Sequence, residues 1–141
     1  LARTNLPLVA YGPRPPPPSV SIPYRGFLSE DEMRVFLSGA AATLFLFDYE
    51  ALGLVPFESL AAGTPVITLP KQGPHRTLSH NRDVYFGRDV GELRELCARI
   101  LQSPPTRADR ARCRESVEVY KSSESARSFQ ALMERLTKSR S

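Results

Sequence analysis

Residues 43–69 read TLFLFDYEALGLVPFESLAAGTPVITL, and this stretch decides the fold. The apolar run Thr43–Phe47 predicts a strand that is buried on both faces, as in a parallel sheet. A helix is predicted to follow, with Pro56 at its first position and Gly63 just past its end. Val66–Leu69 is predicted to be a second buried strand. This order of elements predicts an α/β fold, with a parallel sheet that is flanked by helices and binds a small polar ligand at its strand ends.

The N-terminal part is predicted to add extended segments and one helix. Leu6–Tyr11 is typical of a short buried strand. The proline run Pro15–Pro18 predicts a stiff extended connection, because polyproline has no internal hydrogen bonds. An SH3-type ligand is the alternative interpretation of this run. Val20–Phe27 continues as extended chain, and Ser29 with Glu32 three residues later is a capping box that begins a helix.

The C-terminal half is predicted to alternate between strand and helix. Residues 71–81 are polar and rich in turn formers, and Val84–Phe86 is predicted to be a last short strand. A helix is predicted from Gly91 onward. A final helical stretch over residues 106–138 is expected to be interrupted near residues 122–125.

The composition is that of one ordinary globular domain. The chain has 141 residues, of which 41% are hydrophobic and 24% charged. No apolar run approaches the roughly 18 residues that a membrane span requires, and the first residues do not form a signal peptide. We expect a single domain over residues 1–141 that is cytoplasmic, or peripheral to a membrane through sequence outside it.

The formal charge of +4 lies in the C-terminal helices. Residues 91–141 carry 11 Lys+Arg and 7 Asp+Glu, whereas residues 1–90 carry 8 of each. The basic residues Arg110, Arg112 and Arg114 are interleaved with acids, which is typical of a solvated helix face with ion pairs along it. An anionic partner surface is the alternative, and we expect no nucleic acid partner.

The two cysteines, Cys97 and Cys113, lie in two different predicted helices, and the sequence around them has no metal-type spacing. We expect buried thiols in a reducing compartment, and no metal site.

The turn before the second helix has the chemistry of an anion site. Gly53, Leu54 and Val55 would present free backbone N–H groups at a helix start, and the helix dipole favours phosphates there without a metal. Glu58 is predicted near the third helical position and Glu50 at the strand end. Carboxylates accept paired hydrogen bonds from the vicinal hydroxyls of a ribose or a hexose. The plainer alternatives are that Glu58 neutralises a helix N-terminus and that Glu50 is an exposed turn residue.

These residues resemble a known family. Glu50-x7-Glu58 and the ESLAAGTPVI run that begins at Glu58 are similar to the signature of the family 4 retaining glycosyltransferases, which have the GT-B architecture. Upstream, residues 24–33 resemble the family's Gly-x-Val-Ser-x-Glu-Glu-Leu element. The resemblance extends over roughly residues 6–103. It implies that the chain is the C-terminal, Rossmann-like lobe, which binds a nucleotide-diphosphate sugar.

The resemblance also implies roles for individual residues. Glu58 would bind the ribose hydroxyls, and Glu50 would be the catalytic residue at the transferred hexose. The backbone of Gly53–Val55 would bind the diphosphate, and the loop with Gly26 and Phe27 would border the base. Transfer to a hydroxyl of an unknown sugar, lipid or protein acceptor would retain the anomeric configuration, with no cofactor and no metal.

Several departures from the family pattern bear on activity. Ala51 and Leu52 stand where the family has Gly-Phe, which adds a methyl group and removes an aromatic wall beside the sugar. The proline run stands where a helix is usual. The family's diphosphate-binding Arg and Lys would precede Leu1, and the acceptor lobe is missing. We therefore expect a fragment that is inactive without its N-terminal lobe.

Two other functions compete with this one. The first is a glycosyltransferase-like binding or scaffold module without activity. The second is an inverting GT-B N-acetylglucosaminyl transferase, which the run Ala62–Pro70 also resembles. Lys71, His75 and Arg76 follow a strand end and are secondary candidates for phosphate contacts. His80 and Asn81 have no partner that the sequence suggests.

Overall fold

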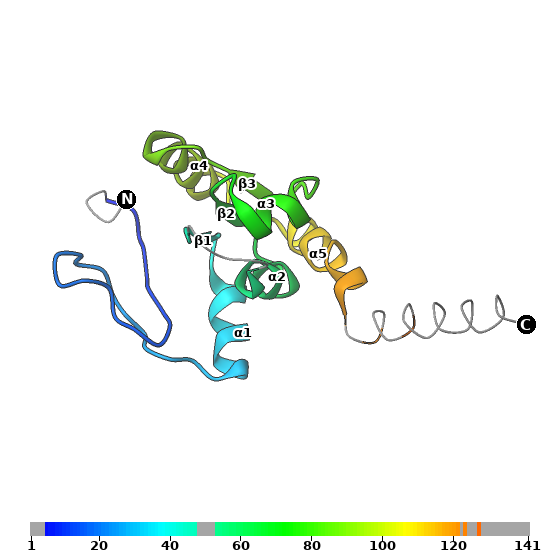
Figure 1. Cartoon of the computed structure of the whole chain (residues 1–141), viewed down its shortest axis with the longest axis horizontal. Coiled ribbons are helices and arrows are strands. Elements are labelled where there is room, and N and C mark those ends of the chain that lie inside the picture. Colours follow the sequence, from blue (N-terminus) through cyan, green and yellow to red (C-terminus); the bar gives the residue numbers. More distant parts are fainter. Residues whose placement is uncertain (1–4, 48–52, 122, 124–126, 128–141) are drawn as a thin grey trace, which may run out of the picture.

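A three-stranded parallel sheet forms the centre of the molecule (Figure 1). The computed structural model describes residues 5–47, 53–121, 123 and 127. The strands are β1 (Thr43–Phe45), β2 (Val66–Thr68) and β3 (Val84–Phe86), in the order β1-β2-β3. Their register pairs Thr43 with Val66 and Val66 with Val84. The three apolar runs thus form the sheet, which confirms the predicted strands.

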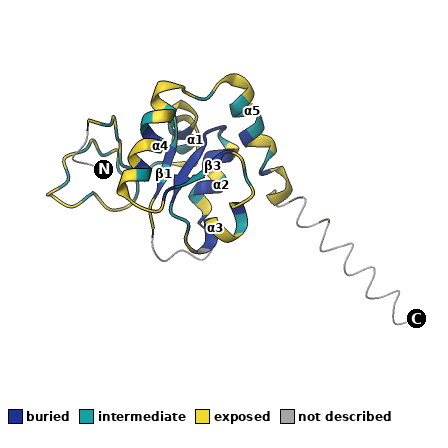
Figure 2. Cartoon of the chain, turned by 90° about the horizontal axis from the view of Figure 1, so that it is seen from above, coloured by how far each residue is buried: buried dark blue, intermediate teal, exposed yellow. Residues whose placement is uncertain are grey.

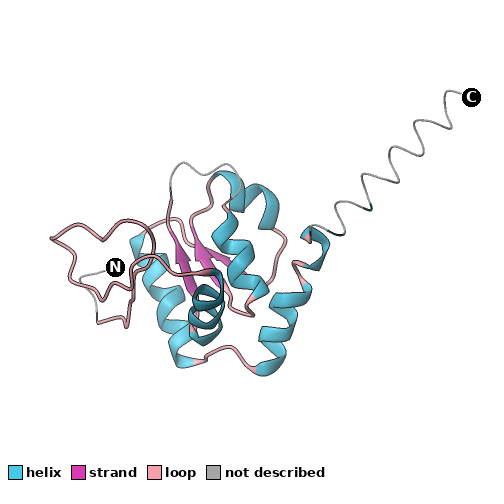
Figure 3. Cartoon of the chain, turned by 90° about the horizontal axis from the view of Figure 1, so that it is seen from below, coloured by secondary structure: helices cyan, strands magenta, loops and turns pink. Residues whose placement is uncertain are grey.

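Helices flank both faces of this sheet (Figures 2 and 3). In the described part of the chain they are α1 (Glu30–Gly39), α2 (Leu54–Ala61), α3 (Gln72–Leu78), α4 (Val90–Gln102), α5 (Arg107–Glu115) and the 3-10 helix η1 (Glu118–Tyr120). Successive side chains of a strand point to opposite faces, so Val66 packs with α2 and α5 while Ile67 packs with α4. The architecture is therefore the predicted α/β fold, a Rossmann-like parallel sheet flanked by helices.

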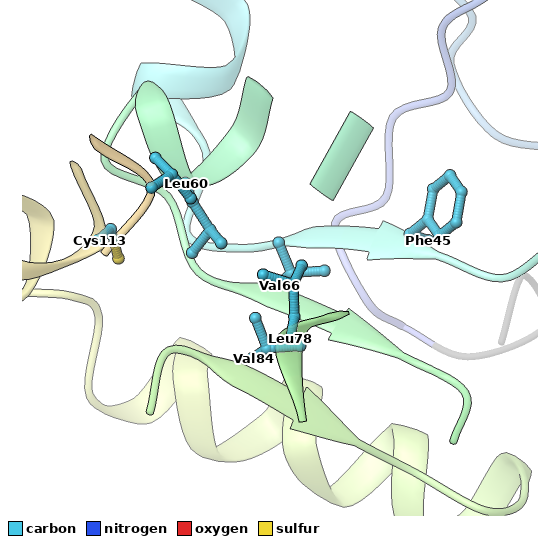
Figure 4. Packing of buried hydrophobic residues seen from close by; sticks show 7 residues of the cluster. Phe45, Leu60, Val66, Leu78, Val84 and Cys113 are labelled. Atoms are coloured by element: carbon cyan, nitrogen blue, oxygen red, sulfur yellow. The ribbon is translucent and has the colours of Figure 1, made fainter. Parts of the chain in front are cut away.

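The larger apolar cluster lies between the sheet and the helices α2, α3 and α5 (Figure 4). Its buried members are Phe45, Leu60, Val66, Leu78, Val84, Cys113 and Val117. The cluster on the other face contains Ile67, Leu93 and Cys97. Both cysteines are free and buried, as predicted.

The two N-terminal extended segments do not join the sheet. The prediction of a strand at Leu6–Tyr11 is wrong: its one pairing is an isolated parallel bridge between Ala10 and Tyr24. Prolines explain why the pairing stays short. Pro7 and Pro23 have no N–H and cannot donate a ladder hydrogen bond. The proline run that follows ends in a turn, in which the Val20 N–H donates to the Pro17 carbonyl at 2.8 Å.

Helix α3 was not predicted, because residues 71–81 are mostly polar and include a proline. Pro74 is the third residue of α3, where the backbone N–H would have no partner within the helix. Leu78, fully buried at 0% exposure, anchors α3 in the core. The polar residues His75 and Arg76 are exposed. Leu78 and the buried Gly73 and Pro74 thus hold α3 against the core, while His75 and Arg76 face solvent.

The other helices agree with the sequence in type and differ at their ends. The capping box of Ser29 and Glu32 begins α1 as predicted. Helix α4 begins at Val90, because the Asp89 side chain accepts a hydrogen bond from the Glu92 N–H. The predicted helical stretch over residues 106–138 is interrupted earlier than expected, after Glu115, where η1 follows. The remainder of that prediction falls largely outside the described residues.

The arginines of α5 are not all solvated, which corrects the interpretation of the basic face. Arg112 donates two hydrogen bonds to the carboxylate of Asp83, which is only 2% exposed, at 3.0 and 2.6 Å. Arg110 donates to the carbonyls of Ser38 and Ala40, both at 3.0 Å. These two side chains connect α5 to the end of α1 and to Asp83, the residue before β3. Only part of the surplus positive charge is therefore available to an anionic partner.

Candidate functional site

Helix α2 begins at Leu54, two residues earlier than predicted, and Gly53 is its N-cap residue. Gly53 has a φ of 75°, in the left-handed region. Because glycine has no side chain, no side-chain hydrogen bond caps the start of the helix. A Cβ at this position would lie 3.1 Å from the Phe45 ring and 3.2 Å from Pro74. A side chain at this position is therefore strained by the backbone angle, and Phe45 or Pro74 would have to shift by a few tenths of an ångström to admit it. Pro56 is the third residue of α2, where its missing N–H is still tolerated.

This helix start leaves backbone donors for a ligand. The N–H groups of Leu54 and Val55 belong to the first turn and have no acceptor within the helix. None of the first-turn residues of α2 is acidic, so the helix itself supplies no carboxylate against the partial positive charge of its dipole. Leu54 is exposed and Val55 is half-buried. The arrangement suits an anionic group.

Glu58 lies further along α2 than the sequence predicted. Since α2 begins at Leu54, Glu58 is its fifth residue, about 6 Å along the helix axis from the first. Its side chain is exposed. The interpretation of Glu58 as a carboxylate that neutralises the first turn is therefore wrong, because it lies beyond that turn. An exposed carboxylate at this position is available to a ligand that also contacts the helix start.

Glu50 and the substituted turn residues Ala51 and Leu52 lie outside the described residues. The preceding residues Leu46 and Phe47 are described, and both are exposed, at 39% and 65%. The apolar strand β1 thus emerges from the core just before the turn. The role and position of Glu50 stay a prediction.

Two glycines bring the ends of the N-terminal extended segments together. Gly12 and Gly26 have φ values of 129° and 74°, and the Gly12 N–H donates to the Gly26 carbonyl at 2.9 Å. The Tyr24 hydroxyl donates to the Gly12 carbonyl at 2.5 Å. Phe27 follows this junction with 81% of its side chain exposed. The role of Gly26 and Phe27 beside a base stays a prediction.

Tyr11 is a neighbour of this region that the sequence analysis did not single out. Its hydroxyl is buried and has no hydrogen-bond partner among the described residues. Burial, and then the negative charge of Glu58, raise the pKa of Tyr11 above its usual value of 10.0. Glu58 is therefore close enough to the N-terminal segment for their charges to interact. No sequence signal marked Tyr11, because it lies 47 positions from Glu58 in the chain.

Of the secondary candidates, Lys71 and His75 are exposed, whereas Asn81 makes hydrogen bonds within the fold. The His75 ring packs edge-on against Phe86 at 5.3 Å. Asn81 donates to the Ser116 hydroxyl at 2.9 Å and accepts from the Asp83 N–H at 2.9 Å, so its role is structural. Lys71 is exposed and has interactions of its own. Across residues 5–47 and 53–121 no group of three or more His, Cys, Asp or Glu side chains could hold a metal ion.

Residues 19–117 match the family model described as glycosyl transferases group 1. The chain belongs to this family. A comparison with curated proteins gave no match. Membership supports a role in glycosyl transfer, with a nucleotide-sugar donor and an acceptor, for this group 1 glycosyltransferase domain. None of its described helices is both long and apolar enough to cross a bilayer.

Proposed function

We propose that this group 1 glycosyltransferase domain is the donor-binding C-terminal lobe of a family 4 retaining enzyme with GT-B architecture. The observation that carries the proposal is the start of α2, where Gly53 leaves the Leu54 and Val55 N–H groups without a side-chain cap. The diphosphate of the donor binds at these groups. An N-terminal lobe outside residues 1–141 supplies the acceptor site, and neither a metal nor a cofactor takes part.

Glu58 binds the ribose hydroxyls in this proposal. Glu58 is exposed and lies four residues after Leu54, about 6 Å along the axis of α2, and an ionised carboxylate accepts two hydrogen bonds from a vicinal diol. The Gly26 and Phe27 loop borders the base. Glu50 contacts the transferred hexose. The acceptor hydroxyl attacks the anomeric carbon from the face that the donor diphosphate leaves, the bond from that carbon to the diphosphate breaks, and the hydroxyl proton passes to the leaving diphosphate.

The ribose assignment predicts the effect of removing the Glu58 carboxylate. In a protein that includes both lobes, we expect Glu58→Ala to weaken binding of uridine or guanosine diphosphate by about 1.5–3 kcal/mol, roughly ten- to a hundredfold. Isothermal titration calorimetry measures this change. Glu95→Ala on the exposed side of α4 is the matched control and leaves affinity unchanged. Unaltered affinity in Glu58→Ala excludes the ribose contact.

Glu50 is predicted to act on turnover instead of nucleotide affinity. The substitution Glu50→Gln keeps the shape of the side chain and removes its charge, so we expect kcat to fall at least about tenfold while the affinity for the nucleoside diphosphate stays within about twofold. Steady-state kinetics with the nucleotide sugar, together with calorimetry of the diphosphate, separate the two effects. Wild-type kcat in Glu50→Gln removes this residue from the site.

A further inference from the structure

An exposed proline run lies in the N-terminal segment, between Gly12 and Val20. Residues 13–18 read PRPPPP. All of them are exposed except Pro16, which is half-buried. In Figures 1 to 3 the segment that contains this run loops away from the sheet and its helices. No residue of the run belongs to the proposed donor site, so its role has to be found elsewhere.

Hydrogen bonds fix the chain at both ends of the run. Before the run, the Gly12 N–H donates to the Gly26 carbonyl at 2.9 Å, and the Tyr24 hydroxyl donates to the Gly12 carbonyl. At its end, the Val20 N–H donates to the Pro17 carbonyl at 2.8 Å and closes a turn. A partner that binds between these anchors does not have to order a free chain, so less conformational entropy is lost on binding.

The sequence of the run fixes its backbone conformation. Each proline holds its φ at about −65°, and a residue that precedes a proline is kept in the extended region. Residues 15–17 satisfy both conditions, because each is a proline and each precedes one. The structure has no bend or turn at these positions. Residues 15–17 therefore form a short polyproline II segment, which needs no further ordering before it binds a partner.

The faces of this segment differ in burial. A polyproline II helix has about three residues per turn, so residues three positions apart lie on the same face. Pro15 and Pro18 therefore share one face, Pro17 lies on the second face, and Pro16 lies on the third. Of these four prolines only Pro16 is half-buried, and the others are exposed. The face of Pro16 thus points toward the protein, and the other two faces point to solvent.

We propose that the exposed prolines Pro15, Pro17 and Pro18, with Arg14 beside them, bind a protein domain that has an aromatic-lined polyproline groove of the SH3 type. Such grooves dock PxxP segments in the polyproline II conformation, and Pro15 and Pro18 have this spacing. The flat rings of the groove pack against the proline rings, whose conformation is already fixed. Arg14 is exposed and supplies a cation for a carboxylate beside the groove.

A connecting role alone does not account for the composition of the run. Ala10 pairs in parallel with Tyr24, so the chain between them has to return to the start of the second extended segment. Extended residues of any type can span that return. Proline at four successive positions adds rigidity and exposed apolar rings, which the return does not need and which a recognition segment uses. This inference does not rest on the proposed sugar chemistry.

The test titrates isolated SH3 domains with the 141-residue chain. The domains are chosen to have carboxylates beside the proline groove, and the fluorescence of the tryptophan in that groove reports binding. The chain has no tryptophan, so the whole signal comes from the SH3 domain. We expect saturable binding by at least one of these domains, and we expect Pro15→Ala to weaken it at least about tenfold. Arg14→Glu is expected to weaken binding by a similar factor, and more strongly at low salt, because it places a carboxylate against those of the groove.

Pro16→Ala is the matched control, because it removes the same ring from the face that points toward the protein. Loss of the stiffness of one proline alone changes affinity by about two- to fivefold, and we expect Pro16→Ala to stay within that range. Far-UV circular dichroism and the urea midpoint check that the variants are folded. The absence of binding by any of the SH3 domains overturns the proposal, as does equal weakening by Pro15→Ala and Pro16→Ala or unchanged affinity in Arg14→Glu. None of these results depends on nucleotide-sugar binding, which Glu58→Ala tests separately.

Discussion

Gly53 is the residue on which the start of α2 depends. With a φ of 75° and the Phe45 ring 3.1 Å from any Cβ, we expect Gly53→Ala to lower the free energy of unfolding by about 1–2 kcal/mol. Gly39→Ala is the control, because nothing lies within 4 Å of its Cβ position and its φ is not in the left-handed region. That change is expected to be neutral or stabilising by up to about 1 kcal/mol. Urea denaturation measures both, and equal stability of the two variants contradicts the strain argument.

The conformation and position of individual site residues were predictable where they depend on the local sequence. Gly53 was recognisable as the turn, because a glycine between a buried strand and a helix supplies the left-handed angle. The position of Glu58 in its helix was not, because Pro56 satisfies the geometry of either the first or the third residue. Tyr11 depends on contacts across the chain, for which the sequence has no local signal.

At the scale of elements, α5 is held by one arginine in particular. Arg110 donates to the carbonyls of Ser38, Ala40 and Gly63 and to the Thr64 hydroxyl, at 3.0 to 3.2 Å. It thus satisfies the carbonyl ends of α1 and α2 together, which have no basic residue of their own in the last turn. The amphipathic sequence of α5 predicted its helix. The tertiary role of its arginines could not be predicted, because partners 29 to 72 positions away in the sequence leave no periodic pattern.

We expect Arg110→Met to destabilise the fold by about 2–3 kcal/mol. The methionine keeps much of the apolar stem and removes the charged donors, which leaves partly buried carbonyls unpaired. Arg94→Met on the exposed side of α4 removes the same charge and is expected to change stability by less than about 0.5 kcal/mol. Thermal and urea unfolding measure the difference. Equal effects of the two substitutions would mean that Arg110 acts only through net charge.

At the scale of the whole molecule, the three strands of the sheet were predictable from the sequence, whereas the pairing of the N-terminal segments and the helix α3 were not. Three continuous apolar runs each became a strand, because burial on both faces requires that composition. The N-terminal runs have a similar composition and form a single bridge, because proline removes donors of ladder hydrogen bonds. Helix α3 shows the converse: its polar sequence folds because the completed core accepts Leu78. Tertiary packing, and not local pattern, decides both cases.

The closed core also predicts how stability depends on alkaline pH. Burial, and then the charge of Asp83, raise the pKa of the Cys113 thiol to about 12, against about 8.5 in an unfolded chain. A raised pKa means that the folded state holds the proton more tightly. The stability that this thiol contributes is therefore complete below about pH 8.5 and is lost as the pH rises toward 12. Tyr11 and Tyr85, whose pKa values burial also raises, act in the same direction at higher pH.

We expect the urea midpoint of the reduced protein to fall between pH 7 and about pH 10.5. The midpoint is expected to fall less in Cys113→Ala, because this variant has a cavity at both pH values but no thiol that ionises. An equal fall in the two proteins would show that Cys113 titrates as an exposed thiol does, and that α5 does not seal this face of the sheet.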